Sequence, residues 1–282
     1  MVLHVSSRNI KEKICAHFQW ESNLVKFIKP TISVITVLLN AERHLEQTIQ
    51  SVLNQTYKSI EYIIVDGGST DRSLEIINKY KKHIDHFISE KDEGIADAMN
   101  KGVALATGDY ILFLHADDYL KSEDVLEKVS DFFNEPSDII TCNILFGKKF
   151  KLCKPRGFNF WFNFKQGIYH QGTFCRRQLI ERLRGFDTQF RIAMDYDFFL
   201  RAYQSKARLK KIPIVLTIMR DTGISSRQDW QSLKYRFDEE RRVHEKNCES
   251  SSMRILYKLY WFLYLPYRRV LFIHNTKIQR HE

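Results

Sequence analysis

The amino-acid sequence predicts an α/β fold: a doubly wound, largely parallel sheet with helices on both faces and further helices at the C-terminal end. Two observations support this prediction. Between residues 31 and 120, short apolar runs that suit buried strands alternate with segments that suit helices. Each apolar run also ends at polar or acidic residues. Alternating strands and helices are typical of βαβ units, which build parallel sheets.

The expected strands of this first part are rich in β-branched and other apolar residues, a composition typical of strands buried on both faces. They cover residues 32–39, 60–65, 84–89 and 110–114. Helices are expected between them at residues 42–54, 73–81 and 95–106. The first helix places Leu45, Ile49 and Val52 on one face, as packing against a sheet requires.

The rest of the chain is less regular. Residues 138–146, 168–175 and 211–219 are expected to be strands, whereas residues 122–133, a segment opening at Met194, and residues 229–246 are expected to be helices. The predicted organisation is an N-terminal extension at 1–30, with one helix near 9–18, a main domain at 31–220 and a helical C-terminal segment at 221–282.

Polar side chains follow each of the first four expected strands. They are Asn40, Asp66, Asp92 and the pair Asp117-Asp118. An isolated Asp-Asp pair is usually a turn or the start of a helix, because Asp favours both. In a parallel sheet, however, the carboxyl ends of the strands share one edge, where ligands bind. Acidic or polar residues at four successive strand ends therefore favour a ligand site.

The chemistry of this edge indicates a metal ion. The formal net charge of the chain is +10, which predicts an anionic partner. The common glycine-rich phosphate loops, G-x-G-x-x-G and G-x-x-x-x-G-K-[ST], are absent. Carboxylates repel a diphosphate unless Mg²⁺ or Mn²⁺ bridges the two. We therefore expect metal-assisted binding of a nucleotide diphosphate. The five cysteines are scattered, which indicates neither a zinc site nor a disulfide framework and fits a reducing cytosol.

Ordered motifs over residues 31–220 resemble the inverting family 2 glycosyltransferases, which have the GT-A nucleotide-diphospho-sugar fold. The motifs are the first strand with Asn40, V-D-G-G-S-T-D at 65–71, D-E-G-I-A-D-A-M-N-K-G at 92–102, L-H-A-D-D at 114–118 and D-Y-D-F-F-L-R at 195–201. The resemblance implies a nucleotide-binding half at 31–120 and an acceptor-binding half at 121–220. It is strongest with bacterial transferases that assemble surface polysaccharides.

The resemblance also implies roles for individual residues. Asn40, Asp66, Asp92, Asn100 and Asp117 are expected to contact the nucleotide. Asp118, with Asp117 beside it, is expected to bind Mn²⁺ or Mg²⁺. His170 and Gln171 are expected on the acceptor or diphosphate side, although a lone His on a strand is more often structural. Asp195 corresponds to the general base that deprotonates the acceptor hydroxyl. Helical spacing alone leaves Asp197 open as the alternative base.

Three departures from the family pattern affect these expectations. His115 stands where many members have a first carboxylate, which leaves metal binding to Asp117 and Asp118. Met194 replaces a Glu that often precedes the base. The Q-x-x-R-W motif of processive synthases is missing after Arg201. The last departure favours transfer of a single sugar.

The C-terminal residues 253–281 mix aromatic and basic side chains, a composition typical of segments at an anionic membrane interface. We therefore expect a cytoplasmic protein that associates peripherally with the inner face of the cytoplasmic membrane and uses a glycan or polyprenyl-diphosphate-linked acceptor. A helix packed on the main domain is the simpler alternative. No signal peptide or membrane-spanning segment is expected.

Three alternative functions remain open from the sequence. A polyprenyl-phosphate glycosyl synthase would share the fold. A degenerate, non-catalytic nucleotide-sugar binder would explain His115. A nucleic-acid-binding protein would use the basic and aromatic residues 150–164 and the C-terminal segment. That last reading leaves the acidic strand ends unexplained, so residues 150–164 are expected to be a loop beside a sugar site, and no nucleic-acid partner is expected.

Overall fold

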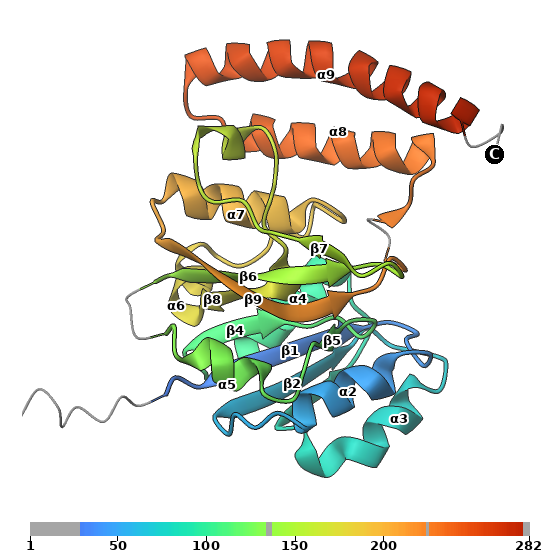
Figure 1. Cartoon of the computed structure of the whole chain (residues 1–282), viewed down its shortest axis with the longest axis vertical. Helices are drawn as coiled ribbons and strands as arrows, with labels where there is room; N and C mark the ends of the chain where they lie inside the picture. The colour runs from blue at the N-terminus through green and yellow to red at the C-terminus, as the bar shows by residue number, and fades with distance from the viewer. Residues whose placement is uncertain (1–28, 134–136, 224–225, 279–282) are drawn as a thin grey trace, which may run out of the picture.

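The computed structural model describes residues 29–133, 137–223 and 226–278, so the helix expected near residues 9–18 lies outside the described part. Within that part, nine strands form one mixed sheet in the order β3-β2-β1-β4-β8-β6-β9-β5, with β7 paired to β6. Helices lie on both sides of the sheet, and the last two are stacked at one end of the molecule (Figure 1).

The first half of the sheet is parallel, as the sequence predicts. Its strands are β1 (Ile32–Leu38), β2 (Ile60–Asp66), β3 (His86–Ser89) and β4 (Tyr110–Phe113). β1 pairs in parallel with β2 on one side and β4 on the other, and β2 pairs in parallel with β3. The connecting helices are α2 (Leu45–Leu53), α3 (Ser73–Tyr80), which the short 3-10 helix η1 (Lys81–His83) extends, and α4 (Ile95–Leu105).

Alternating side chains of β1 divide the core into two layers. Ile32 and Val34 pack with α2, α3 and α5 (Val125–Ser130) on one face of the sheet. Ile35 and Val37 pack with α4, α6 (Arg177–Arg182) and α7 (Met194–Gln204) on the other. This alternation follows from strand geometry, in which successive side chains point to opposite faces.

Beyond β4 the sheet is mixed, so the prediction of a largely parallel sheet holds only for the first half. The strands are β5 (Tyr119–Leu120), β6 (Ile139–Phe146), β7 (Lys151–Cys153), β8 (Thr173–Arg176) and β9 (Leu209–Met219). β8 is antiparallel to both β4 and β6, and β9 is parallel to β6 but antiparallel to β5. Apolar runs identify buried strands but carry no information about strand direction.

Three local predictions in the second half differ from the structure. Residues 168–175 do not form one strand, because the 3-10 helix η3 (His170–Gly172) precedes β8. The amide of Gly172 and the hydroxyl of Thr173 both donate to the carbonyl of Tyr169, and these two hydrogen bonds close the turn. Residues 150–164 contain β7 and the 3-10 helix η2 (Phe160–Asn163) as well as loop. The expected helix at 122–133 is shortened to α5.

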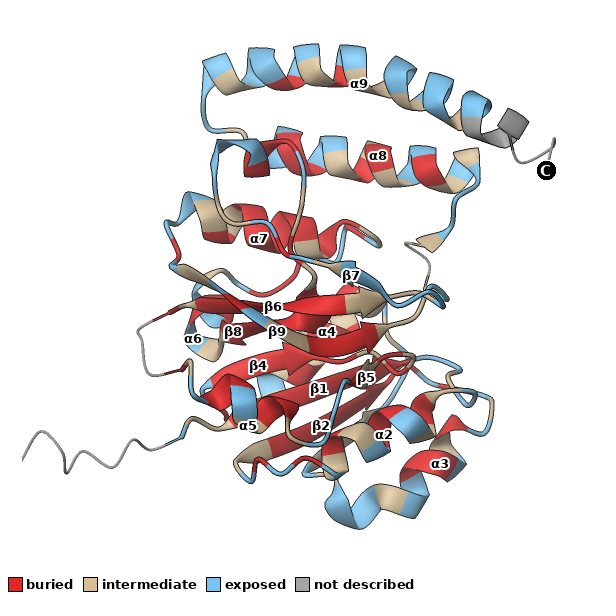
Figure 2. Cartoon of the chain, viewed as in Figure 1, coloured by how far each residue is buried: buried red, intermediate tan, exposed pale blue. Residues whose placement is uncertain are grey.

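The C-terminal segment forms two long helices, α8 (Trp230–Lys246) and α9 (Ser251–Ile278). Asp229 caps α8, since its Oδ1 accepts a hydrogen bond of 2.9 Å from the Ser232 amide. Leu233 and Phe237 of α8 pack against Trp261 of α9. Much of α9 is exposed (Figure 2). In the described ranges, no helix is both long and apolar enough to cross a membrane.

Candidate active site

A cavity of about 400 Å³ lies beyond the end of β4 and reaches the C-terminal helices. Five of the predicted site residues line it: Asp117 and Asp118 after β4, His170 and Gln171 in η3, and Asp195 in the first turn of α7. Residues from three separate parts of the chain therefore meet in one place. The other predicted residues, Asn40, Asp66, Asp92, Asn100 and Asp197, are not part of this lining.

Asp118 is buried at the wall of this cavity. Burial, reinforced by the neighbouring Asp117 carboxylate, raises the pKa of Asp118 well above its usual value. Its Oδ1 accepts a hydrogen bond of 2.9 Å from the Arg220 amide, and Gln171 donates a second. Asp117 Oδ2 accepts a hydrogen bond of 2.5 Å from Thr222.

Arg220 also binds this pair through its side chain. Its guanidinium donates to the Asp117 carbonyl and lies 4.8 Å from the ring centre of Tyr119. Arg220 directly follows β9, about a hundred residues downstream of the pair, and no local motif predicts it as a site residue.

The Asp117-Asp118 pair fits a hard divalent cation. Two adjacent carboxylates concentrate negative charge at a site where burial already disfavours ionisation of Asp118. A bound Mg²⁺ or Mn²⁺ would compensate this charge and would take further oxygen ligands from water and phosphate. Among the described residues, no group of three or more His, Cys, Asp or Glu side chains forms a complete metal site.

A hydrogen-bonded chain links His115, His170 and Asp195. The Nδ1 atom of His170 lies 3.1 Å from Oδ2 of Asp195, and its Nε2 lies 3.1 Å from Nε2 of His115. Burial, together with the nearby His170, lowers the pKa of His115 well below its usual value, so His115 is neutral. Because a carboxylate only accepts hydrogen bonds, we assign the Nδ1 proton of His170 to the bond with Asp195.

Asp197 occupies a different environment from Asp195. Its side chain is fully buried, and its Oδ2 accepts hydrogen bonds from Arg201 at 2.8 Å. Its Oδ1 accepts from Lys246 and Asn247, each at 2.9 Å. These donors occupy both oxygens of the buried carboxylate, so Asp197 ties α7 to the end of α8.

The residues expected at the nucleotide end form a second cluster at the carboxyl ends of β1, β2 and β3. Asp66 is buried, and the hydroxyls of Ser69 and Ser89 donate to its two carboxylate oxygens. Asn40 has a φ of 52°, and its Oδ1 accepts a hydrogen bond of 2.8 Å from the Thr70 amide. The parallel register places the last residues of these strands side by side.

Two further predicted residues have identifiable partners. A Cβ atom on Gly67 would lie 2.2 Å from Oδ2 of Asp92, so this glycine lets the carboxylate approach the loop after β2. Asn100 makes two hydrogen bonds with the backbone of Phe186, of 2.7 and 2.8 Å. Its side chain thus holds the loop before α7, and its predicted contact with a nucleotide stays a prediction.

The far end of the cavity is basic. Its lining includes Lys165, Arg191, Arg236 of α8 and Arg268 of α9, together with Glu240. Burial raises the pKa of Glu240 to about 6, although the nearby Arg236 opposes this shift. Apart from Arg268, which lies in the basic and aromatic segment 253–281, none of these residues belongs to a functional feature identified from the sequence. They line the cavity because α8 and α9 pack over it.

Comparison with known proteins identifies the family. The family model "Glycosyl transferase family 2" matches residues 33–207. The chain is 35% identical over 190 residues to the "PGL/p-HBAD biosynthesis glycosyltransferase" of Mycobacterium tuberculosis; the match covers 63% of this chain and 72% of that protein. It is 44% identical over 115 residues to a glycosyltransferase of Haemophilus influenzae, with 40% and 46% covered.

Solved structures share the fold. Residues 1–349 of TarS from S. aureus, in complex with UDP-GlcNAc, have a TM-score of 0.62 at 20% identity, covering 78% of this chain and 68% of that one. The mannosyltransferase PcManGT from Pyrobaculum calidifontis, in complex with GDP-Man and Mn²⁺, has a TM-score of 0.62 at 17% identity, covering 90% and 78%. The chain belongs to glycosyltransferase family 2 and is a glycosyltransferase with the GT-A fold.

Proposed function

We propose that this protein is an inverting, metal-dependent, non-processive glycosyltransferase. It moves one sugar from a nucleotide-diphospho-sugar to a hydroxyl of a lipid-linked glycan during assembly of a bacterial surface polysaccharide. The observation that carries the proposal is the cavity in which Asp195 and the Asp117-Asp118 pair line the same space. A base and a pair of metal-binding carboxylates are the two parts that a direct displacement at a sugar carbon needs.

In this mechanism Asp195 is the general base. Its carboxylate lines the cavity and accepts the acceptor's hydroxyl proton as the oxygen attacks the anomeric carbon. The hydrogen bond from His170 holds the carboxylate in one orientation before the reaction. The hydrogen bonds from Arg201, Lys246 and Asn247 to both oxygens of Asp197 support Asp195 rather than Asp197 as the base. A single displacement by the acceptor inverts the anomeric centre.

The donor is proposed to bind across the strand ends. Asp66, Asn40 and Asp92 would contact the nucleoside, with Asn100 as a further candidate, and Asp117 and Asp118 would hold Mn²⁺ or Mg²⁺. The metal would offset the charge that builds on the departing nucleoside diphosphate. The complexes of TarS with UDP-GlcNAc and of PcManGT with GDP-Man and Mn²⁺ support this assignment by analogy of fold.

The acceptor is proposed to enter from the basic end of the cavity, on the side of His170 and Gln171. Lys165, Arg236 and Arg268 would neutralise its phosphate groups. On α9, several apolar side chains are exposed, including Ile255, Phe262 and Val270. This arrangement supports peripheral binding to the inner face of the cytoplasmic membrane, where a polyprenyl-diphosphate-linked glycan would be presented.

A binding and turnover experiment tests this function. The chain is titrated by calorimetry with UDP, GDP, dTDP and CMP and their common sugar conjugates in the presence of Mn²⁺. We expect one nucleotide family to bind. The matching donor is then incubated with a polyprenyl-diphosphate-linked monosaccharide, and NMR of the product is expected to give the inverted anomer. Binding without turnover would indicate a non-catalytic nucleotide-sugar binder, and no binding at all would contradict the proposed donor site.

A further inference from the structure

Glu239 of α8 binds the backbone segment from which α7 begins. The Glu239 side chain is almost fully buried, at 1% exposed. Its Oε1 accepts a hydrogen bond of 2.9 Å from the amide of Arg191. Its Oε2 accepts hydrogen bonds of 2.8 and 2.9 Å from the amides of Ile192 and Ala193. A buried carboxylate is costly unless it is hydrogen-bonded, and these backbone donors meet that requirement.

This contact lies two residues from the proposed base. Ala193 immediately precedes α7, and its carbonyl accepts the 2.9 Å helix bond from the amide of Asp197. A negative charge beside the first amides of a helix also interacts favourably with the helix dipole. Glu239 therefore sets where the first turn of α7 begins, and Asp195 is the second residue of that turn.

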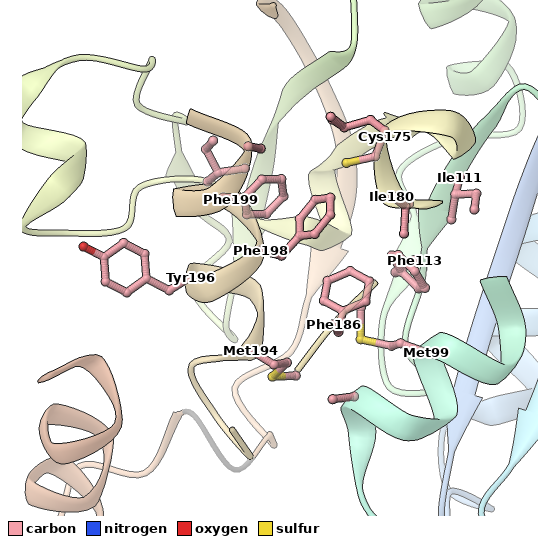
Figure 3. Packing of buried hydrophobic residues seen from close by; sticks show 14 of the residues in the cluster. Met99, Ile111, Phe113, Cys175, Ile180, Phe186, Met194, Tyr196, Phe198 and Phe199 are labelled. Carbon is pink, nitrogen blue, oxygen red and sulfur yellow. The ribbon is translucent and has the colours of Figure 1, made fainter. Parts of the chain in front are cut away.

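The same helix binds α7 on the other side of Asp195. His244 Nε2 lies 2.8 Å from the hydroxyl of Tyr196, and Asn247 Nδ2 lies 2.9 Å from Oδ1 of Asp197. Figure 3 shows the Tyr196 ring on the other side of α7 from Phe198 and Phe186. Contacts with α8 and the residue that follows it thus bracket Asp195, while its own carboxylate meets His170 in the cavity.

We propose that Glu239 is a positioning residue for Asp195: from α8 it fixes the backbone of residues 191–193 and thereby holds the Asp195 carboxylate against His170. The inference rests on the proposed role of Asp195 as the base. The family match ends at residue 207, so α8 lies outside the matched region. The C-terminal segment is then part of the catalytic apparatus and is required for turnover itself.

The test compares Glu239→Gln with Glu245→Gln in the whole 282-residue chain. Gln keeps the size of the side chain but directs an NH₂ group toward backbone N–H groups, so at least one hydrogen bond is lost. Glu245 lies on the same helix with its side chain 66% exposed and paired only with Arg241 in the described contacts, which makes it a matched control. Two readouts need no substrate: hydrogen exchange of the 191–193 amides, and the ¹⁵N resonance of His170 Nδ1.

We expect faster exchange at residues 191–193 in Glu239→Gln and a shift of the His170 signal in the direction that Asp195→Asn produces. We also expect kcat to fall about 10- to 100-fold while KM for the donor found by calorimetry changes less than about twofold. Glu239→Asp, which keeps the charge but is shorter, is expected to recover part of kcat, and it replaces Glu239→Gln if the latter does not fold.

The outcomes separate this inference from the proposed function. Unchanged amide exchange and an unchanged His170 signal in Glu239→Gln would overturn the positioning role, whatever the activity. Equal loss of kcat in Glu239→Gln and Glu245→Gln would do the same. Full turnover by Asp195→Asn would instead overturn the proposed base, and the exchange measurement at residues 191–193 would still report on the contact with Glu239.

Discussion

Asp195 and Asp197 lie two residues apart in α7, yet their carboxylates face opposite environments. Asp195 has its side chain 15% exposed and meets His170 at 3.1 Å in the cavity. Asp197 is fully buried, with basic and amide donors on both of its oxygens. Two residues that are two positions apart lie about 200° apart around the axis of an α-helix. Asp195 therefore faces the cavity, whereas Asp197 faces α8.

This difference predicts that substitution by Asn lowers activity at position 195 but lowers stability at position 197. Asp195→Asn is expected to lower kcat by about 10²- to 10⁴-fold, the usual contribution of a general base, with little change in melting temperature. Asp197→Asn is expected to cost about 1.5–3 kcal/mol of stability, because Arg201 loses its charged partner while Lys246 keeps only Asp187. Turnover and thermal unfolding of both variants check this; comparable stability loss in the two would contradict it.

Removal of the metal is expected to weaken binding of the diphosphate but not of the nucleoside. Without a cation, Asp117 and Asp118 repel phosphate, so EDTA or Asp118→Asn should lower the affinity for the nucleoside diphosphate at least about tenfold. Affinity for the bare nucleoside should stay within about twofold. Calorimetry measures both, with Asp124→Asn, an exposed carboxylate paired with Lys128, as the matched control. Equal affinity for the diphosphate with and without EDTA would contradict the metal site.

His244 is expected to make stability depend on pH. Burial lowers the pKa of His244 to about 3, from an ordinary value of 6.5. Trp261 Nε1 donates to its Nδ1 at 2.9 Å, so protonation would break this bond. The folded state therefore binds fewer protons than the unfolded state between pH 6.5 and 3. The contribution of neutral His244 to the free energy of unfolding is complete above pH 6.5. Below that pH it falls by about 1.4 kcal/mol per pH unit.

Urea unfolding between pH 8 and 5 measures this effect. His244→Phe is expected to be less stable at pH 8, because Trp261 loses its acceptor, but to lose less stability on acidification than the unsubstituted chain. His274, an exposed histidine of α9, provides the control His274→Phe, which should keep the full pH dependence. If the free energy of unfolding fell equally with pH in the unsubstituted chain and in His244→Phe, His244 would be ruled out as the cause of the pH dependence.

The exposed face of α9 is expected to bind anionic membranes. Phe262 is 75% exposed and Val270 is 66% exposed, and both belong to α9. Phe262→Ser combined with Val270→Ser should reduce flotation with phosphatidylglycerol vesicles at least about fivefold, since burial of each side chain contributes about 1.5–3 kcal/mol. Phe150→Ser with Leu152→Ser removes equally apolar exposed side chains elsewhere and should have no effect. Equal flotation of both double variants would contradict the role of α9.

Much of the fold could be predicted from local patterns. The apolar, β-branched run of β1 and the helical spacing of Leu45, Ile49 and Val52 are properties of neighbouring residues, and they identified the parallel half of the sheet with its helices. The same logic located the start of α7 at Met194 and the helix at 229–246, which the structure has as α8. Strand direction beyond β4 was not encoded in this way, because it depends on which distant strand supplies the hydrogen-bonding partner.

The sequence by itself determined the family, the acidic strand ends and the two candidate bases, because each depends on residue type and local spacing. Only the tertiary structure decided which carboxylate faces the cavity, since that depends on the partners of α7: His170 on one side, and α8 on the other. It also brought Arg220 and Glu239 to residues far away in the chain. Such contacts arise from packing of distant elements, and no short-range pattern records them.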